Sequence, residues 1–104
     1  MKHFLLFYDV GPEFIQQREK FRTKHLELAW QSHGKGELLL AGALAPPTDR
    51  AVLLFQGDSP AVAENFAKAD PYVTSGLVQK WTVWQWNTVA GEAAASPLRP
   101  TDKR

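Results

Sequence analysis

The 104-residue sequence contains no cysteine. Disulfides, a thiolate nucleophile and a cysteine-based zinc site are therefore excluded. Neither sign of charge dominates either, because 12 lysines and arginines are balanced by 11 aspartates and glutamates, for a formal net charge of +1. The chain thus lacks the basic surface that is typical of nucleic-acid-binding proteins, and we expect no nucleic-acid partner.

Long hydrophobic runs are also absent. The N-terminal stretch MKHFLLFYDVG has one lysine before a short apolar run, which Asp9 interrupts, and no small-residue cleavage site follows it. We interpret this stretch as a β-strand, and we expect a cytoplasmic protein that does not bind a membrane. A chain of this length fits a single domain, which buries roughly two-thirds of the surface that its unfolded form exposes.

Four short segments rich in β-forming residues or leucine are predicted strands, and two segments between them have helical periodicity. The predicted strands lie within residues 3–9, 37–44, 50–57 and 76–86, and the helices within residues 12–36 and 58–69. The order β-α-β-β-α-β predicts a ferredoxin-like α+β fold with a four-stranded antiparallel sheet. We expect residues 1–87 to form this domain and residues 88–104 to form a mobile tail.

The predicted strands do not alternate between apolar and polar residues. Phe4, Leu6 and Tyr8 face one side of the first strand, and Leu5 and Phe7 face the other. Two helices can cover only one face of a four-stranded sheet, so the other face needs a second partner. We predict a homodimer packed sheet against sheet. The alternative is a monomer whose tail folds back over the sheet, and the small, polar, proline-broken tail makes it weaker.

His25 is the first candidate for chemistry. It shares a helical stripe with Phe21 and Leu28, and Arg18 and Arg22 precede it by one or two turns. An imidazole normally titrates near pH 6.5, which suits proton transfer near neutrality. A histidine at this position can equally be a core residue whose hydrogen bonds are satisfied.

Asp70 is the second candidate, and it too has two interpretations. Its carboxylate can accept backbone N–H bonds and close the turn in which Pro71 fixes φ. Alternatively, the fold brings the end of the second helix near the first, which would place Asp70 beside His25 although 45 residues separate them. A carboxylate on one imidazole nitrogen would fix the tautomer and raise the basicity of the other nitrogen.

No motif predicts a metal or a cofactor. The segment HGKG, residues 33–36, lacks the upstream glycine and the following Ser or Thr of a phosphate loop, so we interpret it as a helix end. The three histidines show no metal-ligand spacing. The four tryptophans have no basic residues interleaved with them, which favours a core or interface role over a stacking platform.

Short motifs in a fixed order identify a family resemblance over roughly residues 1–87. The sequence resembles the YciI-like (YCII-related) domain family in the series Tyr8, Arg22-x-x-His25-Leu26, Gly42-x-Leu44, Asp70-Pro71-Tyr72 and Gly76-Leu77. One departure is Ala43, which stands where the family often has proline in a Gly-Pro-Leu motif. This change puts the shape of one pocket wall in doubt and leaves the other motif positions in place.

The resemblance implies a ferredoxin-like domain that dimerises through its sheets, as in the dimeric α+β barrel group. It also implies an active site whose catalytic pair is His25 and Asp70. Our leading hypothesis is acid–base chemistry of the lyase, dehydrochlorinase or isomerase type on a small cyclic or aromatic substrate. Asp70 would orient His25, and an oxyanion or enolate would be stabilised by Tyr8 or Arg22. Substrate contacts are expected from Tyr8, Arg22, Tyr72 and Gly42.

Two other hypotheses stay open at this point. The first is a non-catalytic module that binds a small ligand or has a regulatory role, because this architecture hosts enzymes and binding proteins alike. The second is a purely structural dimer in which His25 is satisfied in the core.

Overall fold

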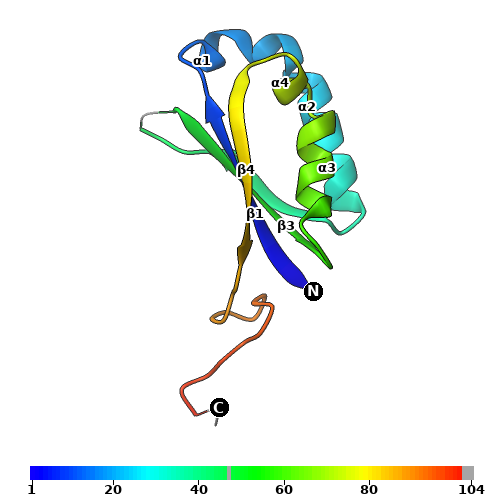
Figure 1. Ribbon diagram of the computed structural model, residues 1–104, viewed down its shortest axis with the longest axis vertical. Coiled ribbons are helices and arrows are strands. Elements are labelled where there is room, and N and C mark those ends of the chain that lie inside the picture. Colours follow the sequence, from blue (N-terminus) through cyan, green and yellow to red (C-terminus); the bar gives the residue numbers. More distant parts are fainter. Residues whose placement is uncertain (47, 102–104) are drawn as a thin grey trace.

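The computed structural model describes residues 1–46 and 48–101; residues 102–104 of the predicted tail lie outside the described residues. Its elements are, in chain order, β1 (Lys2–Val10), α1 (Phe14–Gln17), α2 (Glu19–Gly34), β2 (Leu38–Ala43), β3 (Arg50–Gly57), α3 (Ala61–Ala69), α4 (Pro71–Thr74) and β4 (Val78–Trp86). The strands form one antiparallel sheet in the order β2-β3-β1-β4 (Figure 1). The predicted ferredoxin-like α+β fold is confirmed.

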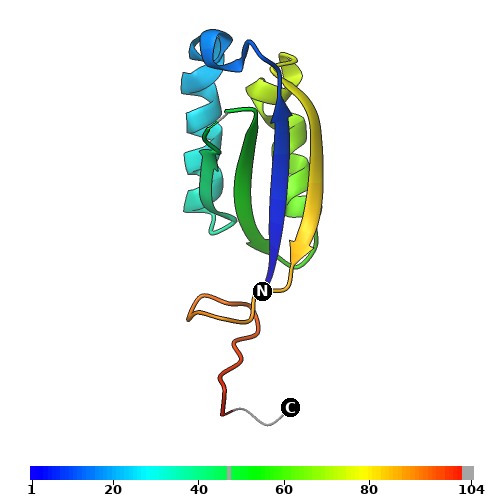
Figure 2. The same ribbon diagram turned by 90° about the vertical axis from the view of Figure 1, so that its left-hand side faces the viewer.

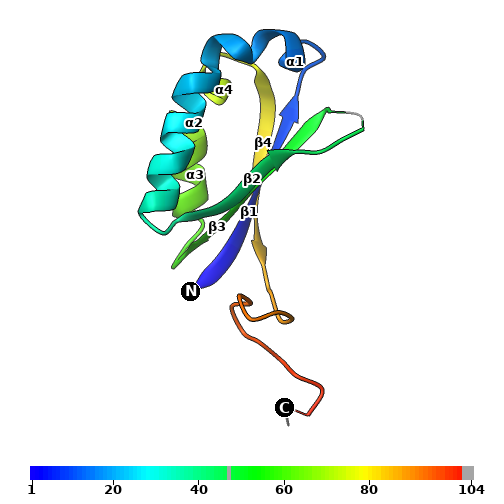
Figure 3. The same cartoon turned by 180° about the vertical axis from the view of Figure 1, so that it is seen from behind.

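All helices lie on one face of the sheet, and the core lies between the two layers (Figures 1 and 3). Because side chains alternate along a strand, Phe4, Leu6 and Tyr8 of β1 all point toward the helices. Each of the three is at most 1% exposed. Leu53 and Phe55 of β3 are buried in the same cluster. This layer is what places the Tyr8 hydroxyl among the helices.

The opposite face of the sheet is apolar, and no helix in the described part of the chain lies on it (Figure 2). Leu5 of β1 pairs there with Leu54 of β3 and Trp84 of β4. Trp84 is 63% exposed, and Leu40 of β2 is 72% exposed. The predicted two-sided character of the strands is therefore confirmed, and the homodimer that we inferred from it stays a prediction.

The first predicted helix is interrupted at Arg18, which separates α1 from α2. The N–H of Arg18 still donates to the carbonyl oxygen of Phe14 at 2.8 Å, whereas the N–H of Phe21 donates to the carbonyl of Arg18, three residues back, at 3.0 Å. The α-helical ladder therefore restarts at Arg18. The C-terminal end of α2 is closed at Gly36, where φ is +79°, a conformation that glycine adopts without strain.

Beyond β4, residues 88–101 form neither helix nor strand and extend past the end of the sheet (Figure 1). Thr88 anchors the first part, because its hydroxyl lies 2.6 Å from Nδ1 of His3 and accepts the N–H of Ala95 at 2.7 Å. The mobility of this tail stays a prediction. Among the described residues, no helix is long and apolar enough to span a membrane.

Candidate active site

Asp70 lies at the junction of α3 and α4 and is fully buried. Its backbone is extended, with φ −71° and ψ 125°, as the residue before a proline prefers. The carboxylate accepts the N–H of Tyr72 at 3.0 Å and thereby caps α4, in which Pro71 occupies the first turn. The capping role considered from the sequence is thus confirmed, in a short helix that the sequence reasoning did not predict.

The same carboxylate accepts two further hydrogen bonds from distant parts of the chain. The hydroxyl of Tyr8, on β1, donates to Oδ2 at 2.7 Å. Nδ1 of His25, on α2, lies 2.8 Å from Oδ1 and 2.9 Å from Oδ2. The predicted proximity of His25 and Asp70 is therefore confirmed. Capping and contact with the histidine are compatible, because one carboxylate has enough lone pairs for both.

The contact with Asp70 sets the tautomer of His25. An ionised carboxylate only accepts hydrogen bonds, so beside such a carboxylate a neutral ring carries its proton on Nδ1 and has a free lone pair on Nε2. No described residue forms a hydrogen bond with Nε2. The imidazole is stacked on the ring of Tyr72, with centroids 3.9 Å apart and an angle of 8°, and meets Phe66 edge-on. These contacts fix the plane of the imidazole.

Both tyrosines of the chain stay protonated well into the alkaline range. Burial is the main cause that raises the pKa of Tyr8, and the negative charge of Asp70 and the hydrogen bond to it add to the effect. Burial also raises the pKa of Tyr72, although Arg22 and Arg18 act in the opposite direction. Each phenol therefore keeps its proton at neutral pH; Tyr8 donates its proton to Asp70, so the predicted use of this hydroxyl to stabilise an oxyanion does not fit the structure, whereas the Tyr72 hydroxyl stays available as a donor.

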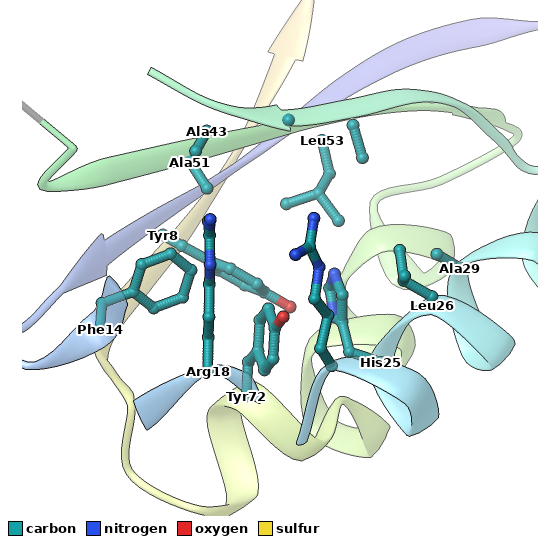
Figure 4. Close-up of a pocket in the computed structure, with 13 residues that line it drawn as sticks. Tyr8, Phe14, Arg18, His25, Leu26, Ala29, Ala43, Ala51, Leu53 and Tyr72 are labelled. Atoms are coloured by element: carbon teal, nitrogen blue, oxygen red, sulfur yellow. The ribbon is translucent and has the colours of Figure 1, made fainter. Parts of the chain in front are cut away.

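A cavity of about 210 Å³ lies between the helices and the sheet, directly against this cluster (Figure 4). Its walls come from β1, α1, the α1–α2 junction, α2, β2, β3 and α4, and they are mostly apolar. The residues that line it are Tyr8, Phe14, Arg18, Arg22, His25, Leu26, Ala29, Ala41, Gly42, Ala43, Ala51, Leu53 and Tyr72. Such a volume accommodates a molecule of about one ring, since drug-sized pockets start near 300 Å³.

The residues that we predicted to form the site lie together around this cavity. His25, Tyr8, Arg22, Tyr72 and Gly42 all line it. Gly42 pairs with Val52 of β3, which pairs with Phe7 on the uncovered face, so Gly42 contributes backbone to the cavity and a side chain there would point away from it. Asp70 is fully buried and does not line the cavity. It contacts Tyr8 and His25, whose side chains do line the cavity.

Eight of the 13 lining residues were not predicted as ligand contacts, and Phe14 and Arg18 are the largest of them. Phe14 packs edge-on against Tyr72, with ring centroids 5.5 Å apart, and Arg18 extends toward Ala43 and Ala51 on the strands (Figure 4). The spacing of Arg18, Arg22 and His25 on one helical face was the signal that could have identified the arginine. No group of three or more potential metal ligands is formed within the described parts of the chain.

Comparison with known proteins gives a family model that matches most of the chain. The model of the YCII-related domain matches residues 1–87. A search among curated proteins found no significant match.

Solved structures with the same fold include a 5-chloro-2-hydroxyhydroquinone dehydrochlorinase, TftG, from Burkholderia phenoliruptrix AC1100, in complex with 2,5-dihydroxybenzoquinone. It is 19% identical, with a TM-score of 0.68, over 83% of this chain and 94% of its own. Protein Atu4242 from Agrobacterium tumefaciens is 16% identical, with a TM-score of 0.58, over 91% and 98% of the two chains. An antibiotic biosynthesis monooxygenase is 16% identical, with a TM-score of 0.55, over 86% and 100%.

Proposed function

Because the chain belongs to the YCII-related domain family, we propose that it is an enzyme that transfers a proton on a small cyclic or aromatic substrate. His25 is the general acid–base residue, and Asp70 is the residue that positions it. The observation that carries the proposal is the fully buried carboxylate of Asp70, 2.8 Å from Nδ1 of a histidine whose ring lines a cavity.

The hydrogen bonds around Asp70 determine what His25 can do. With its proton held on Nδ1, the ring takes up a second proton at Nε2 and becomes an imidazolium beside a carboxylate. The carboxylate stabilises that cation, and the hydroxyl of Tyr8 and the N–H of Tyr72 keep the carboxylate itself in place. The ring can then return the proton to the same or another atom of the substrate.

The negative charge that proton removal leaves on the substrate needs a partner of its own. Arg22 lines the cavity and precedes His25 by three residues, so the two side chains project from neighbouring positions of α2. The Tyr72 phenol, which no described residue hydrogen-bonds through its oxygen, stays protonated because burial raises its pKa. These groups can donate hydrogen bonds to an enolate or phenolate oxygen.

Loss of HCl from a chlorinated ring fits this arrangement. The name of TftG describes the dehydrochlorination of 5-chloro-2-hydroxyhydroquinone, and its ligand is a hydroxylated quinone. In such a step one ring hydroxyl loses its proton and forms a carbonyl while the carbon that bears chlorine gains a proton and becomes sp3. A second ring hydroxyl then gives its proton to the base, its electron pair forms the second carbonyl through the ring, and chloride leaves with the bonding electrons of the carbon–chlorine bond. No external oxidant or reductant is needed, because the ring is converted to a quinone as HCl departs.

The test is chloride release from 5-chloro-2-hydroxyhydroquinone, together with deuterium incorporation from heavy water into a panel of cyclic ketones, lactones and phenols. We expect turnover of at least one compound, a loss on the order of 100-fold or more in His25→Gln, and a smaller loss in Asp70→Asn. His33→Gln is the matched control, because its Nδ1 is also engaged, 2.8 Å from the carbonyl oxygen of Leu38, outside this cavity.

A full rate in His25→Gln would refute the proposed role of the histidine. A compound that binds the cavity but undergoes no reaction or exchange, in wild type and variants alike, would instead support the non-catalytic binding module. Binding that depends on pH, with no turnover at any pH, would have the same meaning.

We also propose that the protein is a homodimer whose two sheets pack face to face. The support is the uncovered apolar face, on which Leu5, Phe7 and Leu54 lie between the exposed side chains of Leu40 and Trp84. Exposed apolar surfaces of this kind on small proteins mark interaction sites.

A further inference from the structure

Arg18 lines the cavity and carries one unsatisfied donor. Its Nε is buried and has no hydrogen-bond partner among the described residues. Arg22, the other arginine of the cavity, donates to Glu19 at 3.2 Å and is therefore partly neutralised. The guanidinium of Arg18 lies over the ring of Phe14, 5.6 Å from the centroid, and its charge also acts on the Tyr72 phenol.

The cavity offers this guanidinium no negative charge. None of the residues that line it is an aspartate or a glutamate. Asp70 is fully buried, and its oxygens already accept hydrogen bonds from Tyr8, His25 and Tyr72. A buried polar N–H without a partner is costly, and more so when it carries charge. The position therefore favours a ligand that brings an anion to Arg18.

The shape of the site narrows the ligand further. A guanidinium has a planar fork of donors that matches the two oxygens of a carboxylate. The remaining wall is apolar and aromatic, with Phe14, Tyr72 and Leu53 around a volume of about 210 Å³. Figure 4 shows Arg18 extending across this space from the helical side toward Ala43 and Ala51. A flat ring fits between these walls with a carboxylate at one side.

We infer that the cavity selects a monocyclic carboxylic acid in its anionic form, and that Arg18 is the residue that binds the carboxylate and sets this specificity. The inference rests on the proposed function, because the ring of the bound acid then lies against His25 as the proton-transfer substrate. The inference gives the substrate a negative charge and a carboxylate group.

The test compares benzoate with benzamide, which has nearly the same shape and no charge. Affinities are measured by calorimetry and by NMR shifts of the wild-type protein and of Arg18→Gln. We expect the wild type to prefer benzoate by about 10- to 100-fold, the range of a hydrogen bond to a charged group, and Arg18→Gln to lose that preference. Arg18→Lys, which keeps the charge without the fork, should retain part of it.

Lys20→Gln is the matched control, because it removes one positive charge from an exposed site two residues away that does not line the cavity. It should leave the preference unchanged. Equal affinity for the two probes in the wild type, no binding of either at millimolar concentration, or an unchanged preference in Arg18→Gln would overturn the inference. Unchanged circular dichroism and melting temperature show that Arg18→Gln is folded.

This experiment separates the inference from the proposed function, because it needs no turnover. If the protein selects benzoate through Arg18 but catalyses no detectable reaction, the inference about the ligand is supported and the proposed enzymatic function is refuted. If an uncharged substrate is turned over, and this turnover is lost in His25→Gln but unchanged in Arg18→Gln, the proposed enzymatic function is supported and the inference about the ligand is refuted.

Discussion

Replacing Tyr8 with phenylalanine removes one hydroxyl group and leaves the packing of the ring nearly unchanged. That hydroxyl donates to Oδ2 of Asp70 at 2.7 Å, and the two residues are 1% and 0% exposed. In Tyr8→Phe the buried carboxylate loses this donor, and water cannot easily take its place at a fully buried oxygen. The account therefore predicts a clear loss of stability from a change of a single atom.

The magnitude follows from the type of bond. Hydrogen bonds to charged groups contribute about 1.5–3 kcal/mol, and full burial of both partners favours the upper part of that range. For a domain of about 100 residues, such a loss lowers the melting temperature by on the order of 10 °C. In urea, with a slope of about 1–3 kcal/mol per molar, the midpoint of unfolding should fall by about 1 M.

The assay is urea unfolding followed by tryptophan fluorescence at pH 7, with all proteins at one concentration, because the stability of an oligomer depends on concentration. Tyr72→Phe is the matched control. Its hydroxyl has no hydrogen bond to any described residue, so we expect a loss below about 0.5 kcal/mol. Equal effects of the two substitutions, or a loss below about 0.5 kcal/mol in Tyr8→Phe, would refute our interpretation of the Asp70 cluster.

Three further predictions concern alkaline stability, a turn and the sheet face. Because burial raises the pKa of Tyr8 in the folded state, the contribution of Tyr8 to the free energy of unfolding should stay constant up to about pH 10 and fall above it as the unfolded phenol ionises. Urea curves above about pH 10 should therefore show a shallower fall in Tyr8→Phe. Gly76→Ala should lower stability by roughly 1–2 kcal/mol, because φ is +87° there, whereas Gly34→Ala, in a helical position with no atom near the new Cβ, should not; thermal melts compare them. Trp84→Glu should convert a dimer to a monomer, as measured by light scattering. Trp30→Glu should not, because Trp30 is 69% exposed on α2, away from the sheet face. A monomeric wild type, or monomers in both variants, would contradict the proposed interface.

The sequence alone was sufficient for the fold, and it offered the contact between His25 and Asp70 as one of two interpretations of Asp70. Strands and helices follow from local apolar periodicity, and the β-α-β-β-α-β order leaves few ways to connect them. The same order brings the end of α3 beside α2, which is why the contact between His25 and Asp70 was predictable across 45 residues. Alternation along β1 also predicted that Tyr8 points the same way as Phe4 and Leu6.

Other features depend on packing that no local pattern encodes. The hydrogen bond from Tyr8 to Asp70 joins residues that are 62 positions apart. It forms only if the Tyr8 side chain extends far enough above the sheet for its hydroxyl to meet the carboxylate at the start of α4. The break at Arg18 has no local signal, since the surrounding residues are compatible with one continuous helix. The burial of the Arg18 Nε without a hydrogen-bond partner therefore could not be predicted from the sequence.

The central claim is that Asp70 holds the proton of His25 on Nδ1 and leaves Nε2 free to accept another. Isotope-edited NMR that correlates the imidazole nitrogens with the ring protons measures this tautomer directly, with the signal of His25 assigned from its absence in His25→Gln. At mildly alkaline pH, where an imidazole is normally neutral, the account predicts a protonated Nδ1 and an unprotonated Nε2 in the wild type, with this preference weakened in Asp70→Asn. A proton found on Nε2 in the wild type, or a tautomer that Asp70→Asn leaves unchanged, would contradict the account.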